Sequence, residues 1–221
     1  MISEMIVSVL EWIGTVAFAV SGSLVAISCS LDLFGVLTVG CVTAVGGGIM
    51  RDLLIGKIPP QIFFRPSVVL VAVLTSLVVF VIAYIKRDKF ASLRERLEKL
   101  NVLFDALGLA TFSVAGVEIA CASAYADNAL LAITLGMLTG VGGGVLRDVL
   151  VNEKPYVLTR HIYAVASIVG SGVYYVMSYY LNYRVVGTVV AVLLTLAIRI
   201  LAATFRWKLP KIRLDEEEPI K

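Results

Sequence analysis

The chain has 221 residues, of which 59% are hydrophobic and 16% are charged, and its mean hydropathy is +0.94. This composition is too apolar for an ordinary soluble domain and indicates a membrane protein. The net charge of +3 gives no reason to expect a nucleic-acid partner, because basic residues of a membrane protein first serve to set its orientation.

Apolar stretches long enough to cross a bilayer recur along the whole chain. About 20 apolar residues in a helix span a hydrocarbon core of roughly 30 Å. The first stretch could instead be a signal peptide, but Glu4 and Glu11 stand where a basic region would be expected. We therefore predict an all-α membrane protein with seven transmembrane helices and a polar tail, 207–221. The helices are expected at about 5–28, 33–55, 66–85, 102–123, 128–151, 161–181 and 185–206.

Basic residues are distributed unequally between the two sides that seven spans define. One side would carry 13 of them: Lys86, Arg87, Lys89, Arg94, Arg96, Lys99, Lys154, Arg160, Arg206, Lys208, Lys211, Arg213 and Lys221. The other side would carry 3, namely Lys57, Arg65 and Arg184. The positive-inside rule then predicts that the N-terminus is outside and the C-terminus is cytoplasmic.

Two strings occur twice and reveal an internal duplication. Gly-Gly-Gly-x-x-Arg-Asp stands at 46–52 and 142–148, within the second and fifth predicted helices. Gly-x-x-x-Phe-x-x-x-Gly stands ahead of each, at 14–22 and 108–116. The copies are 94 residues apart at the first string (108 minus 14) and 96 apart at the second (142 minus 46).

The duplication divides a single transmembrane domain into repeats of three helices each. Repeat one is expected at about 5–86 and repeat two at about 101–182, with a basic linker at 87–100 and a seventh helix at 185–206. Because three is odd, the second repeat would enter the membrane from the opposite side. This predicts an inverted repeat, as in many transport folds.

The glycine triplets are predicted to kink or unwind the second and fifth helices. Each glycine in a helix interior costs about 1 kcal/mol relative to alanine. Backbone carbonyls released at such a kink could line a water-filled cation path. The alternative is a tight helix crossing through small residues. The residues concerned are Gly46, Gly47, Gly48, Gly142, Gly143 and Gly144.

Acidic and basic side chains fall at equal depths in each half of the chain. Buried charges in a membrane normally pair or face water. We therefore predict the ion pairs Glu11–Arg51 and Asp105–Arg147, which could serve only to hold helices together. Asp52 and Asp148 would lie toward opposite mouths of the path and attract cations.

The sequence offers little for an enzyme or a metal site. Cys29, Cys41 and Cys121 lack metal-ligand spacing and are expected to be small packing residues. His161 is the only histidine and is expected to be hydrated. We therefore expect no enzymatic activity, no cofactor and no metal other than a transported cation.

The linker after the third helix has helical spacing of its leucines. Leu93, Leu97 and Leu100 would let 91–100 lie along the cytoplasmic surface. Its basic residues could reach anionic lipid head groups. The alternative is that they are a topology signal alone. These residues are Lys86, Arg87, Lys89, Arg94, Arg96 and Lys99.

The paired strings resemble those of the prokaryotic members of the trimeric intracellular cation (TRIC) channel family, which are also grouped as a doubled glycine-transporter domain. The resemblance covers the first six predicted helices and extends to the seventh. It implies a homotrimer in the prokaryotic cytoplasmic membrane, in which each subunit has its own pore for monovalent cations, chiefly K⁺. It also implies that the pore runs beside the kinked helices, and bound lipid is a further expectation.

A second function stays open, namely a secondary transporter of a small amino acid such as glycine. Such a transporter would need alternating access between the inverted halves. The acidic residues of the duplicated strings lie nearer the helix ends than the middle of the membrane. This placement favours the channel.

Overall fold

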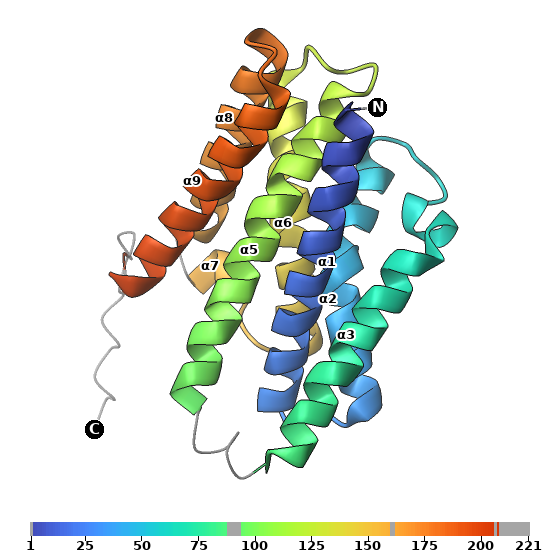
Figure 1. Cartoon of the computed structure of the whole chain (residues 1–221), viewed down its shortest axis with the longest axis vertical. Helices are drawn as coiled ribbons and strands as arrows, with labels where there is room; N and C mark the ends of the chain where they lie inside the picture. Colours follow the sequence, from blue (N-terminus) through green and yellow to red (C-terminus); the bar gives the residue numbers. More distant parts are fainter. Residues whose placement is uncertain (1, 88–93, 160–161, 206, 208–221) are drawn as a thin grey trace, which may run out of the picture.

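The computed structural model is an all-helical bundle and describes residues 2–87, 94–159, 162–205 and 207 (Figure 1). Six helices in this part of the chain are long and apolar enough to cross a membrane. They are α1 (Ile2–Ser28), α2 (Leu33–Leu54), α3 (Pro66–Ile85), α5 (Arg94–Cys121), α6 (Ala129–Leu150) and α9 (Arg184–Thr204). The shorter elements are η1 (Gln61–Phe64), α7 (Tyr156–Thr159), α8 (Tyr163–Tyr175) and the π-helical η2 (Val176–Tyr180).

The sixth predicted span differs from the others. The stretch 161–181 corresponds to α8, which has 13 residues and is followed directly by the five residues of η2. The π-helical turn interrupts the α-helical ladder there, so neither element alone has the length of a spanning helix. The predicted count of seven long helices is therefore not confirmed.

The second helix of each repeat begins in the same way. The side chain of Asp32 accepts a hydrogen bond of 2.8 Å from the backbone N–H of Gly35 at the start of α2. Asn128 accepts one of 2.9 Å from the N–H of Leu131 at the start of α6. Such caps satisfy backbone donors that a helix start leaves open. Asp32 and Asn128 are 96 positions apart, the same offset as the glycine triplets.

The first two glycines of each triplet lie in the contact between α2 and α6. A Cβ added at Gly47 would clash with the carbonyl oxygen of Thr139, and one at Gly143 would clash with that of Thr43. Both helices run through their triplets as unbroken α-helices. The predicted kinks are therefore not confirmed, and the triplets instead allow the close helix crossing that was the alternative.

The first helices of the two repeats, α1 and α5, also cross through equivalent residues. The Phe18 ring packs on Gly108 and the Phe112 ring packs on Gly14. The centroids of the two rings are 5.4 Å apart, and both rings are buried. Together α1, α2, α5 and α6 form the core of the bundle, in which these ring and glycine contacts of repeat one have counterparts in repeat two.

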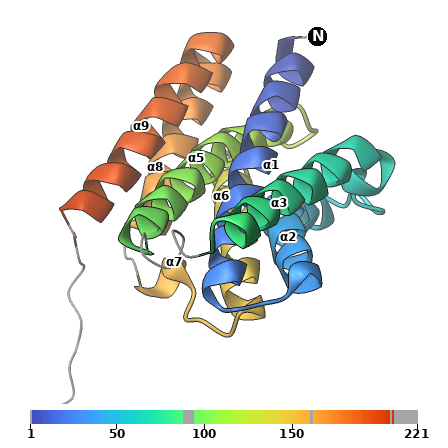
Figure 2. The same ribbon diagram turned by 60° about the horizontal axis from the view of Figure 1, so that its bottom comes forward.

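The remaining helices flank this core. The α3 helix lies on one side, and α8 and α9 lie on the other (Figures 1 and 2). We call the two ends of the bundle the Asp52 end, at the top of Figure 1, and the Asp148 end, at the bottom. The first residue of α1 lies at the Asp52 end, whereas α9 ends toward the other.

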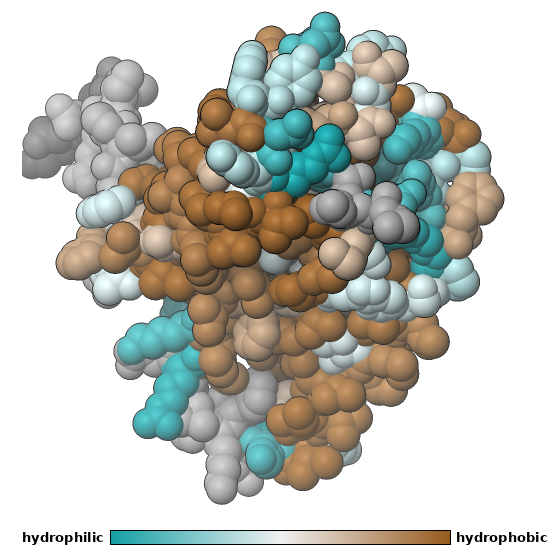
Figure 3. All heavy atoms as spheres, turned by 45° about the horizontal axis from the view of Figure 1, so that its top comes forward, coloured by the Kyte–Doolittle hydropathy of each residue, from teal (hydrophilic) through white to brown (hydrophobic). Residues whose placement is uncertain are grey.

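The outer surface is suited to lipid. Hydrophobic residues cover much of the face seen in Figure 3, and hydrophilic residues gather in its upper part. Large exposed apolar side chains on the flanking helices include Leu70, Leu74, Val78, Val81 and Ile82 of α3 and Val185, Val186, Val189 and Leu193 of α9. So much exposed apolar surface is expected of a protein whose exterior faces a bilayer.

Candidate functional site

Arg147 is the centre of a fully buried polar cluster at the Asp148 end. Its Nη1 donates hydrogen bonds to Asp105, at 2.9 Å, and to the hydroxyl of Ser21, at 2.7 Å. Its Nε donates to Asp148 at 2.8 Å, and its guanidinium lies 5.0 Å from the centre of the Tyr156 ring. The structure thus brings Asp105 and Arg147 together as the sequence predicted.

Two further residues complete this cluster from outside the core. The hydroxyl of Tyr163, at the start of α8, donates to Asp105 at 3.1 Å. Arg199 of α9 places its guanidinium 4.8 Å from the centre of the Tyr163 ring. The nearest contact between Arg199 and Asp105 joins Nη2 to Oδ2 at 3.8 Å. Two carboxylates, Asp105 and Asp148, therefore face two guanidiniums, so the buried charges balance.

The charged residues at the Asp52 end are paired differently from the prediction. Glu11 pairs with Arg65, from the segment between η1 and α3, so the predicted Glu11–Arg51 pair is wrong. Arg51 instead folds back on its neighbour Asp52, to which Nε and Nη2 donate at 2.9 and 2.8 Å. Because Asp52 binds the Arg51 guanidinium, Glu11 is left to pair with Arg65.

Asp52 and Asp148 have equivalent surroundings at the two ends. Each accepts a hydrogen bond from the arginine before it, and each takes a second from a backbone N–H further along the chain. The donors are Gln61 at 2.9 Å and Tyr156 at 2.8 Å. Both aspartates are buried. They lie at opposite ends of the bundle, as predicted, and each also holds the connection that follows its helix. Their role as attractive mouth charges stays a prediction.

A small recess of about 20 Å³, with room for little more than one water molecule, opens at the Asp52 end, and its walls combine charged and apolar side chains. The carboxylates of Glu11 and Asp52 and the ring of Phe112 are among the side chains that line it. The hydroxyl of Thr15 lies buried at its wall without a hydrogen-bond partner among the described residues. The lining residues are Glu11, Thr15, Ala44, Val45, Gly48, Arg51, Asp52, Gln61, Ile62, Val68 and Phe112.

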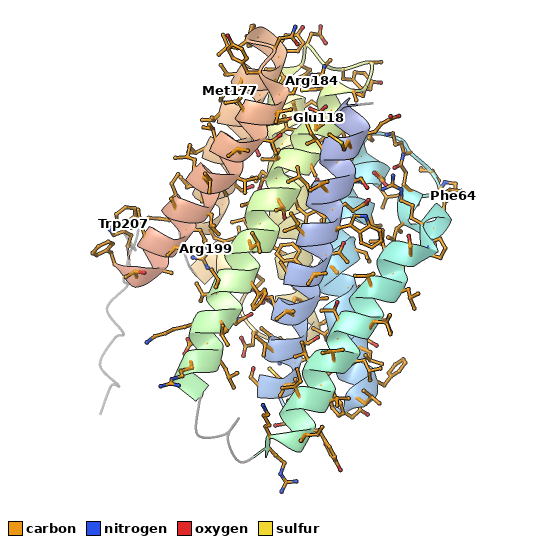
Figure 4. All side chains as sticks on the ribbon, in the orientation of Figure 1. Phe64, Glu118, Met177, Arg184, Arg199 and Trp207 are labelled. Carbon is orange, nitrogen blue, oxygen red and sulfur yellow. The ribbon has the colours of Figure 1, made fainter. Side chains whose placement is uncertain are left out.

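Sequence reasoning missed two buried charges, Glu118 and Arg199. Glu118 lies at the Asp52 end of α5, where it accepts a hydrogen bond of 2.5 Å from Tyr174 and pairs with Arg184 at 3.4 Å (Figure 4). A usable signal existed, because an ionisable residue within an apolar span marks a functional or pairing site by default. Neither residue has a charged counterpart in the other repeat, so the duplicated strings do not mark them.

The predicted lipid-binding residues that the structure describes lie at the Asp148 end. Lys86 and Arg87 follow α3 and are exposed, as are Arg96 and Lys99 in the first turns of α5. Residues 94–100 are continuous with α5, and Arg94 begins it. Lys89, the rest of the predicted surface segment 91–100, and His161 lie outside the described residues.

An apolar exterior on membrane-length helices, around a core with buried charge clusters at both ends, defines a multi-pass membrane protein. A family model described as "Glycine transporter" matches the chain twice, at residues 8–84 and 102–179. The UPF0126 inner membrane protein YadS of Escherichia coli K12 is 38% identical over 218 residues, which cover 96% of this chain and 99% of the relative. The UPF0126 membrane protein YvgT of Bacillus subtilis is 36% identical over 93% of this chain and 97% of its own length.

Solved structures agree with these relatives. A prokaryotic TRIC channel crystallised in 0.5 M KCl has a TM-score of 0.81 at 36% identity, over 93% of this chain and 100% of that one. The TRIC trimeric intracellular cation channel orthologue of Rhodobacter sphaeroides has a TM-score of 0.80 at 29% identity, over 91% and 98%. The chain therefore belongs to the TRIC cation channel family and is a multi-pass inner-membrane protein.

Proposed function

We propose that the protein is a cation channel that conducts monovalent cations, chiefly K⁺, through a separate path in each subunit of a homotrimer. The observation that carries this proposal is the pair of charged clusters at opposite ends of one glycine-lined helix crossing. Carboxylates near both ends of a narrow path raise the local concentration of cations. The arginines beside them are held by those acids and kept out of the path.

The proposed path runs along the crossing of α1, α2, α5 and α6. It begins in the recess at the Asp52 end, where Glu11 and the hydroxyl of Thr15 offer oxygen atoms to a cation. It continues past the contact between Phe18 and Phe112, whose rings close it in this conformation. It leaves through the buried cluster around Arg147. Opening must separate the rings and expose that cluster to water.

We further propose that the two repeats are inverted, that α8 with η2 forms a seventh span, and that the N-terminus is outside. Three features support this topology: the equivalent N-caps, the reciprocal glycine contacts, and the location of Ile2 and Thr204 toward opposite ends of the bundle (Figure 1). The exposed basic residues after α3 would then face anionic lipid head groups on the cytoplasmic side.

Site-directed cysteine labelling tests the topology. In a chain without its three native cysteines, Lys86→Cys should react with a membrane-impermeant maleimide only after the cytoplasmic face is made accessible. Phe64→Cys, at the Asp52 end, is the matched control and should react in intact cells, since the Phe64 side chain is 71% exposed. Labelling of position 86 from outside with position 64 protected would reverse the orientation.

A transporter of a small amino acid such as glycine is the second candidate. It is favoured by the description of the matched family and by the unequal openness of the two ends, which alternating access would produce. Liposomes that contain the purified protein can be assayed for K⁺ flux and for glycine uptake side by side. A passive K⁺ flux without glycine uptake supports the channel, whereas saturable glycine exchange without K⁺ flux supports the transporter.

A further inference from the structure

The two ends of the core differ at one pair of equivalent positions. At the Asp52 end, a Cβ added at Gly48 would meet only the Arg51 side chain, at 3.7 Å, and the recess lies beside it. At the Asp148 end, a Cβ added at the equivalent Gly144 would lie 2.8 Å from the Tyr163 hydroxyl. Tyr163 thus fills the space that is open in the other half.

The residue of repeat one that is equivalent to Tyr163 can be identified from the offset between the repeats. Gly40 and Gly136 are equivalent, and they lie against Ser76 of α3 and Ser171 of α8 respectively. These serines are 95 positions apart, and the same offset relates Tyr163 to Val68, which lines the open recess. A buried tyrosine therefore stands at the Asp148 end where the other repeat has a valine.

Arg199 holds this tyrosine from α9. Its guanidinium covers the Tyr163 ring at 4.8 Å, a distance at which a cation and an aromatic ring attract each other. The side chain is 2% exposed and lies in the part of α9 nearest the Asp148 end (Figure 4). A positive charge thus stands beside the carboxylate of Asp105, where a permeating cation would have to pass.

Arg199 is held much less firmly than Arg147. Arg147 donates hydrogen bonds to three side chains, whereas the closest atoms of Arg199 and Asp105 are 3.8 Å apart. Among the described residues, Nε and Nη2 of Arg199 and Oδ2 of Asp105 have no hydrogen-bond partner. The attraction is therefore electrostatic without a hydrogen bond, and Arg199 is the member of the cluster that can leave most easily.

We propose that Arg199 is a tethered cation that closes the Asp148 end of the path by occupying the carboxylate of Asp105 and holding Tyr163 in place. A shift of α9 would withdraw it, after which the cluster has two acids and one arginine. The resulting single negative charge would admit a monovalent cation. Because α9 flanks the core, this movement leaves the crossing of α1, α2, α5 and α6 intact. The inference rests on the proposed channel function.

Neutralising Arg199 tests the proposal. Arg199→Gln should raise K⁺ flux into liposomes about five-fold or more, an effect typical of a biased two-state equilibrium. Its melting temperature should also rise more steeply with K⁺ concentration than that of the wild type. N-methylglucamine at equal ionic strength is the control cation in this measurement. Arg199→Lys keeps the charge and should behave like the wild type in both assays. Lys154→Gln is the matched control, because it removes an exposed positive charge from the same end of the bundle, and it should change neither.

The outcomes separate this inference from the proposed function. A folded Arg199→Gln protein with unchanged flux and no K⁺-dependent shift in melting temperature overturns the inference. Should that variant fail to fold, Tyr163→Phe decides, because it removes only the hydroxyl bound to Asp105: raised flux supports the closure and unchanged flux overturns it. A wild type without K⁺ flux removes the channel function, while the K⁺-dependent melting of Arg199→Gln still decides whether Arg199 occupies a cation site.

Discussion

Replacing Gly47 with alanine should lower the stability of the protein by about 3 kcal/mol, the upper range for overpacking a tight contact. The added Cβ would clash with the carbonyl oxygen of Thr139, which belongs to the backbone of α6. A backbone atom cannot turn aside as a flexible side chain can, so α2 and α6 must separate. Gly143→Ala should have the same effect through the carbonyl oxygen of Thr43.

The same triplet supplies its own control, since Gly48 lacks such a contact. A Cβ added there would meet only the Arg51 side chain at 3.7 Å, an ordinary contact distance. Gly48→Ala should therefore be neutral, or stabilise α2 by up to about 1 kcal/mol through the higher helix propensity of alanine. Thermal unfolding in detergent measures the difference. Equal melting temperatures for the two variants would contradict the close crossing, and K⁺ flux in liposomes shows whether the crossing also shapes the path.

The sequence predicted the membrane class and the repeat because both depend on composition and spacing. Most spans are apolar throughout, and the glycine strings recur at nearly constant offsets. The same strings were less informative about backbone shape. Helix propensity favours a break at three glycines, but propensity describes an isolated helix. In the bundle, Gly47 and Gly143 let two helices touch, and packing contributes more than the propensity costs.

Charged partners were predictable only where both lie in long helices. Asp105 and Arg147 are set at equal depth by two regular helices, and they meet. Glu11 was assigned to Arg51 by the same reasoning, but its partner is Arg65. That residue lies in a short connection, and depth along a helix does not predict where a connection runs. Arg199 could not be placed either, because no spacing rule says which face α9 turns toward the core.

Removing the charge of Arg147 should destabilise the protein more than any other neutralisation in the chain. Among the described residues, Arg147→Met leaves Asp105 and Asp148 with Arg199 as their only nearby guanidinium, at 3.8 Å from Asp105. Breaking a buried pair by removing one partner typically costs about 3–5 kcal/mol. The double variant with Asp105→Asn restores the balance of one acid and one arginine in the cluster. It should therefore be more stable than Arg147→Met alone, although it has lost two charged groups.

The pair of Glu11 with Arg65 at the Asp52 end provides the comparison. Their side chains are 20% and 44% exposed, so water screens each charge when the other is removed. Arg65→Met should then cost no more than about 1 kcal/mol, as for exposed ion pairs in general. Melting temperatures of the three variants in one detergent test the order. If Arg147→Met were as stable as Arg65→Met, or the double variant were less stable than Arg147→Met, the buried cluster would not be held by charge balance. The buried cluster would then act on the proposed path through the packing of its side chains and not through their charges.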